Sequence, residues 1–217
     1  MSTSELVLDR PAPAARRAVP AARLLRSELR LVFRRRRNLA LLAVLAAAPI
    51  LLGVAVRLAG PSGGGPPLLA QVTQNGFFLG MASLVFSSTL FLPMALSVVS
   101  GDSVAGEASS GTLRNLLVVP VGRTRLLAVK YTGVAAFALA CVVTVVGSGL
   151  VTGLVLFPAG DVVLLSGTAV GMADALGRAA LVVAYMTAML ATLGAIGLFF
   201  STLTEVPMGA MAATVTV

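Results

Sequence analysis

The sequence predicts an all-α protein, a polytopic bundle of transmembrane helices. Its 217 residues are 58% hydrophobic and only 11% charged, whereas a soluble domain has about a quarter of its residues charged. The mean hydropathy is +0.99. Apolar runs of about twenty residues recur along the chain, which is the length that a helix needs to cross a hydrocarbon core of about 30 Å. A bilayer, rather than water, is therefore the expected surroundings of most of the chain.

The N-terminal part should lie outside the hydrocarbon. Residues 1–20 are rich in Pro, Ala and Arg and predict a disordered arm. Residues 21–37 place apolar side chains at helical spacing with arginines mostly off that face, which predicts an amphipathic helix on the membrane surface. The run that ends this segment is expected to anchor it to lipid phosphates; it consists of Arg34, Arg35, Arg36 and Arg37.

The transmembrane domain is predicted over residues 38–217. Pro49 should kink the first span and Pro93 should bend the second, and a linker (60–67) separates them. The last apolar stretch is too short to cross, so we expect the sequence to be a piece of a longer chain. The predicted spans are about 38–59, 73–100, 126–157 and 178–202, with the start of a fifth at 206–217.

Small residues recur along the second span at spacings of three and four, and they should form one face. Such a face lets another helix approach closely, within the chain or in a dimer, or it could line a pathway. Its residues are Gly76, Gly80, Ser83 and Ser87. The glycines of the third span indicate a break, a tilt or close packing; they are Gly147, Gly149 and Gly153.

The distribution of basic residues predicts the orientation. With the N-terminus inside, 10 + 4 = 14 of the 16 basic residues face the cytoplasm, and only Arg57 and Arg178 lie outside. We therefore expect a multi-pass protein of the cytoplasmic membrane with a cytoplasmic N-terminus.

The composition excludes several kinds of site. The chain has no histidine and one cysteine, Cys141, so histidine-based nucleophilic and metal sites and an intrachain disulfide are excluded. We predict no catalytic residue and no metal site. The single lysine, Lys130, lies between Val129 and Tyr131, so the chain has no Gly-Lys-Ser/Thr loop for ATP phosphates.

Residues 101–125 form the one substantial polar interruption of the interior and predict a short cytoplasmic helix. Gly111 can start a turn and Pro120 can stop the helix. Its apolar side suits docking into a groove of another protein, although such a helix could also lie on the lipid surface. That side consists of Leu113, Leu116 and Leu117.

The same segment resembles the loop after the second span of ABC-2 type permeases, the membrane subunits of many bacterial drug, polysaccharide and lipid exporters. The resemblance rests on the spacing Glu107-x-x-x-Gly111-Thr112-Leu113-x-x-Leu116-Leu117-x-x-Pro120-Val121-x-Arg123, followed by Lys130. Segment 21–37 is similar to the connecting helix that precedes the first span of these proteins. The resemblance covers the chain from about residue 21 to its end.

The resemblance implies a function and partners. The loop would be a coupling helix that seats in a cleft of an ATP-binding subunit, with Glu107, Gly111 and Thr112 at matching positions. ATP and Mg²⁺ would be bound by that partner, so this chain would not itself be an enzyme and would hold no cofactor. A second permease copy or homologue would complete the transporter, and no nucleic acid would be involved. Family members usually have six spans, whereas this sequence stops inside the fifth.

Spans lined by Ala, Val, Leu, Gly and hydroxyl side chains suit a hydrophobic or amphiphilic substrate, such as a drug, a lipid or a glycan-like molecule. The main alternative is a membrane scaffold or sensor subunit that transports nothing. An ion-coupled transporter would need ionisable residues at mid-membrane depth, and an intramembrane enzyme would need a general base there. The predicted complete spans contain no acidic residue.

Overall fold

The computed structural model describes residues 21–60, 67–109, 111, 123–158, 162–163, 169–204 and 206–216. The predicted arm and five predicted coupling residues lie outside these ranges: Thr112, Leu113, Leu116, Leu117 and Pro120. The described helices are α1 (Ala21–Arg34), α2 (Arg36–Ala59), α3 (Pro67–Gln74), α4 (Phe77–Thr89), α5 (Phe91–Ser109), α7 (Arg123–Leu156), α8 (Met172–Leu203) and α9 (Pro207–Val215). A short antiparallel hairpin pairs β1 (Val162–Val163) with β2 (Ala169–Val170).

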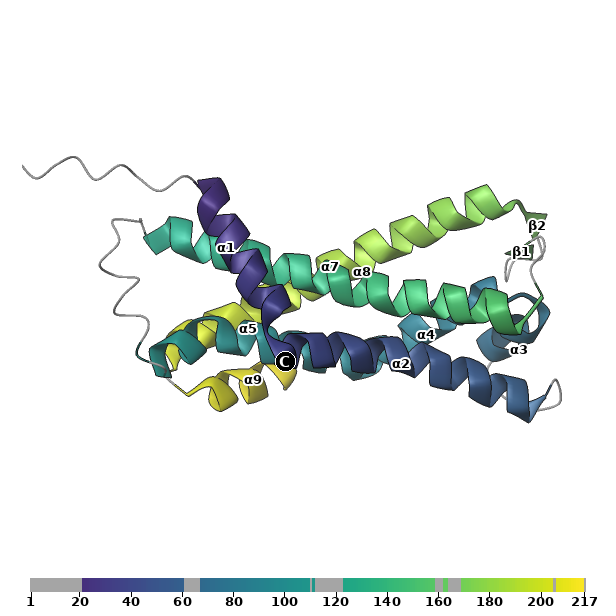
Figure 1. Ribbon diagram of the computed structural model, residues 1–217, viewed down its shortest axis with the longest axis horizontal. Helices are drawn as coiled ribbons and strands as arrows, with labels where there is room; N and C mark the ends of the chain where they lie inside the picture. Colours follow the sequence, from purple (N-terminus) through teal and green to yellow (C-terminus); the bar gives the residue numbers. More distant parts are fainter. Residues whose placement is uncertain are drawn as a thin grey trace, which may run out of the picture.

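The helices form an elongated bundle with two distinct ends (Figure 1). At one end α1 crosses the bundle beside the start of α2, the end of α5 and the start of α7; we call it the arginine end. At the other lie α3 and the β1–β2 pair; we call it the hairpin end. The chain alternates between these ends, as a multi-pass membrane protein requires.

Three of the described helices are long and apolar enough to cross a membrane: α2, α8 and most of α7. The bent pair α4–α5 passes the same test when it is counted as one span. The predicted all-α bundle is thus confirmed. The 34 residues of α7 measure about 51 Å, which exceeds the hydrocarbon core of about 30 Å. This helix is unbroken, so its glycines do not interrupt it.

The second predicted span is a broken helix. α4 and α5 meet at an angle of 55°, with Leu90 between them at φ −139° and ψ −50°. Pro93 lies in the first turn of α5, where a backbone N–H has no helical partner and its loss costs nothing. The proline therefore bends the span about one turn before its own position. Pro49, by contrast, lies within the continuous helix α2.

The second predicted span also extends further along the chain than the sequence indicated. Residues 101–109 were expected to begin the polar loop, but they continue α5 as far as Ser109. Asp102 and Glu107 therefore project from a helix, and both make ion pairs with residues of other helices, Arg37 of α2 and Lys130 of α7. Because these pairs neutralise the two carboxylates, the helix can carry them beyond the apolar run.

Glycines bring α4 and α7 into backbone contact. A Cβ built on Gly76 would lie 2.1 Å from the carbonyl oxygen of Gly153, and one built on Gly153 would lie 2.0 Å from that of Gly76. A Cβ on Gly149 would lie 2.7 Å from the Cα of Gly80. Only glycine permits so close an approach. Gly147, on the same helix, has nothing within 4 Å of such a Cβ.

The buried apolar side chains form two clusters along the bundle. One gathers around Phe137, Leu92 and Leu96, where α5 meets α7. The other gathers around Phe77, Leu79 and Val72, toward the hairpin end. The charged residues of the arginine end lie directly beside the first cluster.

We predict that Gly153→Ala destabilises the fold by about 1–3 kcal/mol, because the added methyl must push α4 away from α7. The melting temperature of the purified protein in detergent measures this loss. Gly147→Ala is the matched control and should leave the melting temperature unchanged or raise it. Equal melting temperatures for the two variants would contradict the proposed backbone contact.

Candidate functional site

Six charged residues meet at the arginine end, and we call them the ion network. They consist of three cations and three carboxylates, so the network as a whole carries no net charge. All of them except Asp102 line a small cavity of about 30 Å³, which is room for about one water molecule. The members are Glu28, Arg35, Arg37, Asp102, Glu107 and Lys130.

Lys130 is the most deeply buried member, with only 3% of its side chain exposed. Its ammonium lies 2.7 Å from a carboxylate oxygen of Glu107 on α5 and 3.2 Å from one of Glu28 on α1. An ammonium withdrawn from water must be paired and hydrogen-bonded. Lys130 on α7 therefore requires both other helices to lie against α7 at this level.

Asp102 forms the second half of the network. Its carboxylate accepts a hydrogen bond from Arg35, and another from Arg37 at 2.8 Å. Both arginines are more than two-fifths exposed, whereas the aspartate is only 13% exposed. These pairs tie the junction of α1 and α2 to α5.

The junction itself is shaped by a break in the helix. Arg35 is extended, at φ −67° and ψ 122°, and separates α1 from α2. The buried Asn38 donates its side-chain N–H to the carbonyl oxygen of Val32 at 2.8 Å, and so satisfies a backbone group near the open end of α1. Phe33 packs on Phe137 of α7, with the ring centroids 6.2 Å apart. Apolar packing and hydrogen bonds together set how α1 crosses the bundle.

Beside the ion network, a serine of α8 forms hydrogen bonds with backbone groups of α5. The hydroxyl of Ser201 donates to the carbonyl oxygen of Gly101 at 2.6 Å, and it accepts from the N–H groups of Val104 and Ala105 at 3.1 and 3.0 Å. The stretch of α5 that carries Asp102 is therefore held by α8 as well as by α1.

The predicted coupling residues lie partly beside this network. Glu107 belongs to it, and Gly111 follows the end of α5 at φ +71°, donating its N–H to Ala108 at 3.1 Å. Arg123 is the first residue of α7. Thr112, Leu113, Leu116, Leu117 and Pro120 lie outside the described residues, so their contacts stay predictions.

The predicted surface anchor divides into two kinds of residue. Arg34 and Arg36 are exposed, and neither has a carboxylate at ion-pair distance among the described residues. Arg35 and Arg37, however, turn to Asp102.

The small-residue face of the second span is enclosed by the bundle. Gly76 and Gly80 contact α7, and the side chains of Ser83 and Ser87 are fully buried. None of these four residues lines an open surface, so the packing interpretation fits the described geometry better than a pathway does.

Sequence reasoning missed three network members: Glu28, Asp102 and Lys130. The signal for Lys130 was present, because a lone lysine inside the predicted span 126–157 needs a buried partner. Glu28 had no such signal, since its partner lies 102 positions away along the chain.

An apolar groove of about 420 Å³ opens between the start of α7 and the end of α8. Apart from a few hydroxyl groups, its lining is hydrocarbon: Thr124, Leu127, Ala128, Tyr131, Ala195, Leu198, Phe199 and Thr202.

We predict that Lys130→Met destabilises the protein by about 3–5 kcal/mol, because it removes the buried cation that Glu28 and Glu107 share. Thermal unfolding in detergent measures the effect. Arg125→Met, on the same helix, is the control and should cost much less, since Arg125 has no ion pair among the described residues. Adding Glu107→Gln to Lys130→Met should recover part of the loss. Failure of the second substitution to recover any stability would contradict the pairing.

Comparison with known protein families supplies the identity. The family model described as ABC-2 family transporter protein matches residues 25–213, which is most of the chain. No curated protein and no solved structure gives a significant match. The matched region begins within α1 and ends within α9, and it includes all six residues of the ion network. The chain therefore belongs to the ABC-2 transporter family and is a membrane-spanning permease of an ABC transporter.

Proposed function

We propose that the chain is the permease of an ATP-driven exporter in the cytoplasmic membrane, with the arginine end in the cytoplasm. Family membership implies an ABC ATP-binding subunit as partner. The excess of basic residues before residue 38 and in the 101–130 segment supports this orientation, because basic residues remain on the cytoplasmic side.

The ion network is the observation that carries the proposal. α5 leads into the segment 110–122 and α7 leads out of it, and Glu107 and Lys130 join these two helices beside that segment. Glu28 extends the connection to α1. A force applied to residues 110–122 would therefore act on three helices at once.

This arrangement suits transmission of motion from an ATPase. When ATP binding closes the partner subunits, the coupling segment is displaced, and the ion network makes α1, α5 and α7 follow it as a unit. ATP hydrolysis takes place in the partner, and this chain forms the path that the substrate takes across the membrane. The substrate would cross, or leave the inner leaflet, at the interface between two permeases.

The substrate class follows from the lining available. The α7–α8 groove and the exposed faces of the spans offer hydrocarbon and hydroxyl groups. A hydrophobic or amphiphilic molecule, such as a drug, a lipid or a glycan-like compound, fits such surfaces, whereas a small hydrophilic ion does not.

The orientation can be tested with two cysteines at matched helix ends. Ala59 ends α2 at the hairpin end and Ser109 ends α5 at the arginine end, and both are exposed. In intact cells, a membrane-impermeant maleimide should label Ala59→Cys, while Ser109→Cys should react only after permeabilisation. The native Cys141 is buried and gives a low background. Labelling of Ser109→Cys from outside intact cells would refute the proposed orientation.

The coupling role can be tested at Gly111, whose φ of +71° proline cannot adopt. Asparagine tolerates this left-handed region, so Gly111→Asn is the matched control. Gly111→Pro should leave the chain in the membrane but lower the amount of co-purifying ATP-binding subunit about tenfold, a difference of about 1.4 kcal/mol. Gly111→Asn should keep most of it.

Equal co-purification with both variants would remove the coupling segment from the interface. If the wild-type chain brought down no ATP-binding subunit, the scaffold or sensor alternative would be favoured instead.

A further inference from the structure

Helix α1 carries more positive charge than the ion network neutralises. Four of its arginines are exposed and have no carboxylate at ion-pair distance among the described residues: Arg23, Arg26, Arg30 and Arg34. The three acidic residues of the arginine end that the structure describes are all engaged inside the network. These four cations are therefore available to an external anion.

Two of the unpaired arginines border an open surface hollow of about 550 Å³. Ser27, Arg30 and Arg34 follow one another at helical spacing along one side of α1. Arg35 completes the basic lining, and its ion pair with Asp102 restrains the guanidinium. The hollow thus combines two available cations with one that is already positioned.

Leu31 gives the hollow an apolar part. It lines the same space as the arginines and is 51% exposed, although it is a large hydrocarbon side chain. A free phosphate ion or an acidic protein surface would offer this side chain no apolar contact. A molecule with a phosphate and a hydrocarbon chain satisfies both kinds of lining group.

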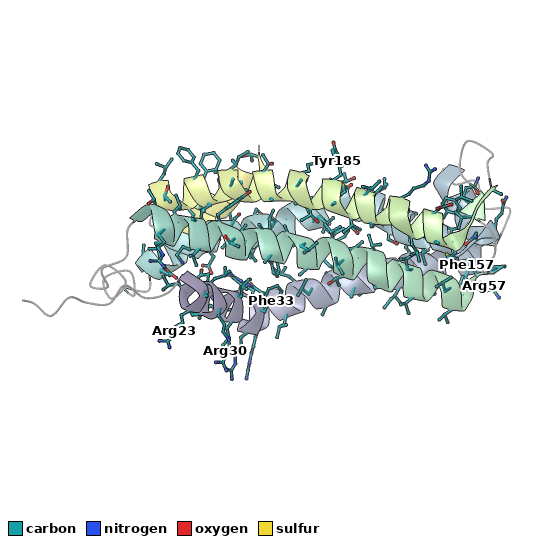
Figure 2. All side chains as sticks on the ribbon, turned by 90° about the horizontal axis from the view of Figure 1, so that it is seen from above. Arg23, Arg30, Phe33, Arg57, Phe157 and Tyr185 are labelled. Atoms are coloured by element: carbon teal, nitrogen blue, oxygen red, sulfur yellow. The ribbon has the colours of Figure 1, made fainter. Side chains whose placement is uncertain are left out.

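The position of the hollow also favours lipid. The next residue after Arg35 begins α2, which is a candidate span, so the hollow lies where hydrocarbon gives way to headgroups. Arg23 and Arg30 project from α1 away from the bundle on the same side (Figure 2). They point outward from the protein and are open to an external anion.

We propose that the hollow lined by Ser27, Arg30, Leu31, Arg34 and Arg35 binds the phosphate headgroup of an anionic phospholipid. The phosphate accepts hydrogen bonds from the guanidinium groups, and the start of the acyl region lies along Leu31. Through Arg35 and its pair with Asp102, the bound headgroup is continuous with the ion network. This inference goes beyond the proposed transport function and does not require the ATP-binding partner.

The full chain reconstituted in phosphatidylcholine vesicles provides the test. Spin-labelled phosphatidylglycerol and spin-labelled phosphatidylcholine are added separately, and the ratio of their association constants with the protein is measured. Arg30→Gln/Arg34→Gln should lower this ratio about fivefold. Arg23→Gln/Arg26→Gln removes the same charge from the same helix outside the hollow, and it should change the ratio by less than about twofold.

Three results would overturn the proposal. Equal losses in both double variants would mean that diffuse charge, and not this hollow, attracts the lipid. Full displacement of the labelled lipid by inorganic phosphate would mean that the ligand is a phosphate ion. An unchanged lipid ratio in Arg30→Gln/Arg34→Gln, with weakened co-purification of the ATP-binding subunit, would assign these arginines to a protein interface.

Discussion

The ammonium of Lys130 is almost completely withdrawn from solvent, and its environment explains how α1, α5 and α7 meet. A buried cation is tolerated only where carboxylates reach it, and here they come from two other helices. Gly133, three residues further along α7, leaves room for this approach: a Cβ there would lie 3.3 Å from the Cγ of Glu28. The requirement to neutralise one charge thus places α1 against the bundle.

The two ends of the bundle are stabilised by different physics. At the arginine end, charge balance and hydrogen bonds hold α1, α2, α5 and α7 together around the ion network. Toward the hairpin end, α4 and α7 approach until their backbones touch, and the contact depends on the absence of side chains at Gly76 and Gly153. Ion pairs can exchange partners or admit water, whereas a backbone contact has no alternative arrangement. The end proposed to meet the ATP-binding partner is thus the end held together by charge.

Much of the fold could be predicted from the sequence because it follows from local properties. Hydrophobic length predicted the spans, Pro93 predicted the bend between α4 and α5, and small residues at helical spacing predicted a close helix contact. The extension of α5 to Ser109 could not be predicted in this way, because Asp102 and Glu107 resemble loop residues until their partners are known. Those partners lie 67 and 23 positions away along the chain, beyond the reach of any helical period. The coupling role stays a prediction for all the residues named for it: Glu107, Gly111, Thr112, Leu113, Leu116, Leu117, Pro120 and Arg123.

The bend at Leu90 separates two helices, α4 and α5, that pack against different neighbours. Before the bend, α4 contacts α7 through glycines. After it, α5 is bound to α8 by the hydrogen bonds of Ser201. α5 also packs closely on α9, where a Cβ on Gly101 would lie 2.9 Å from the backbone nitrogen of Met211. The two halves of the second span are thus held by different neighbours, although α5, α7 and α8 share one apolar core. At the arginine end, Glu107 and Lys130 join α5 to α7 in addition to this core. A rotation at Leu90 would therefore pull on this ion pair, so one buried pair of charges at the arginine end restrains a bend in the middle of the span.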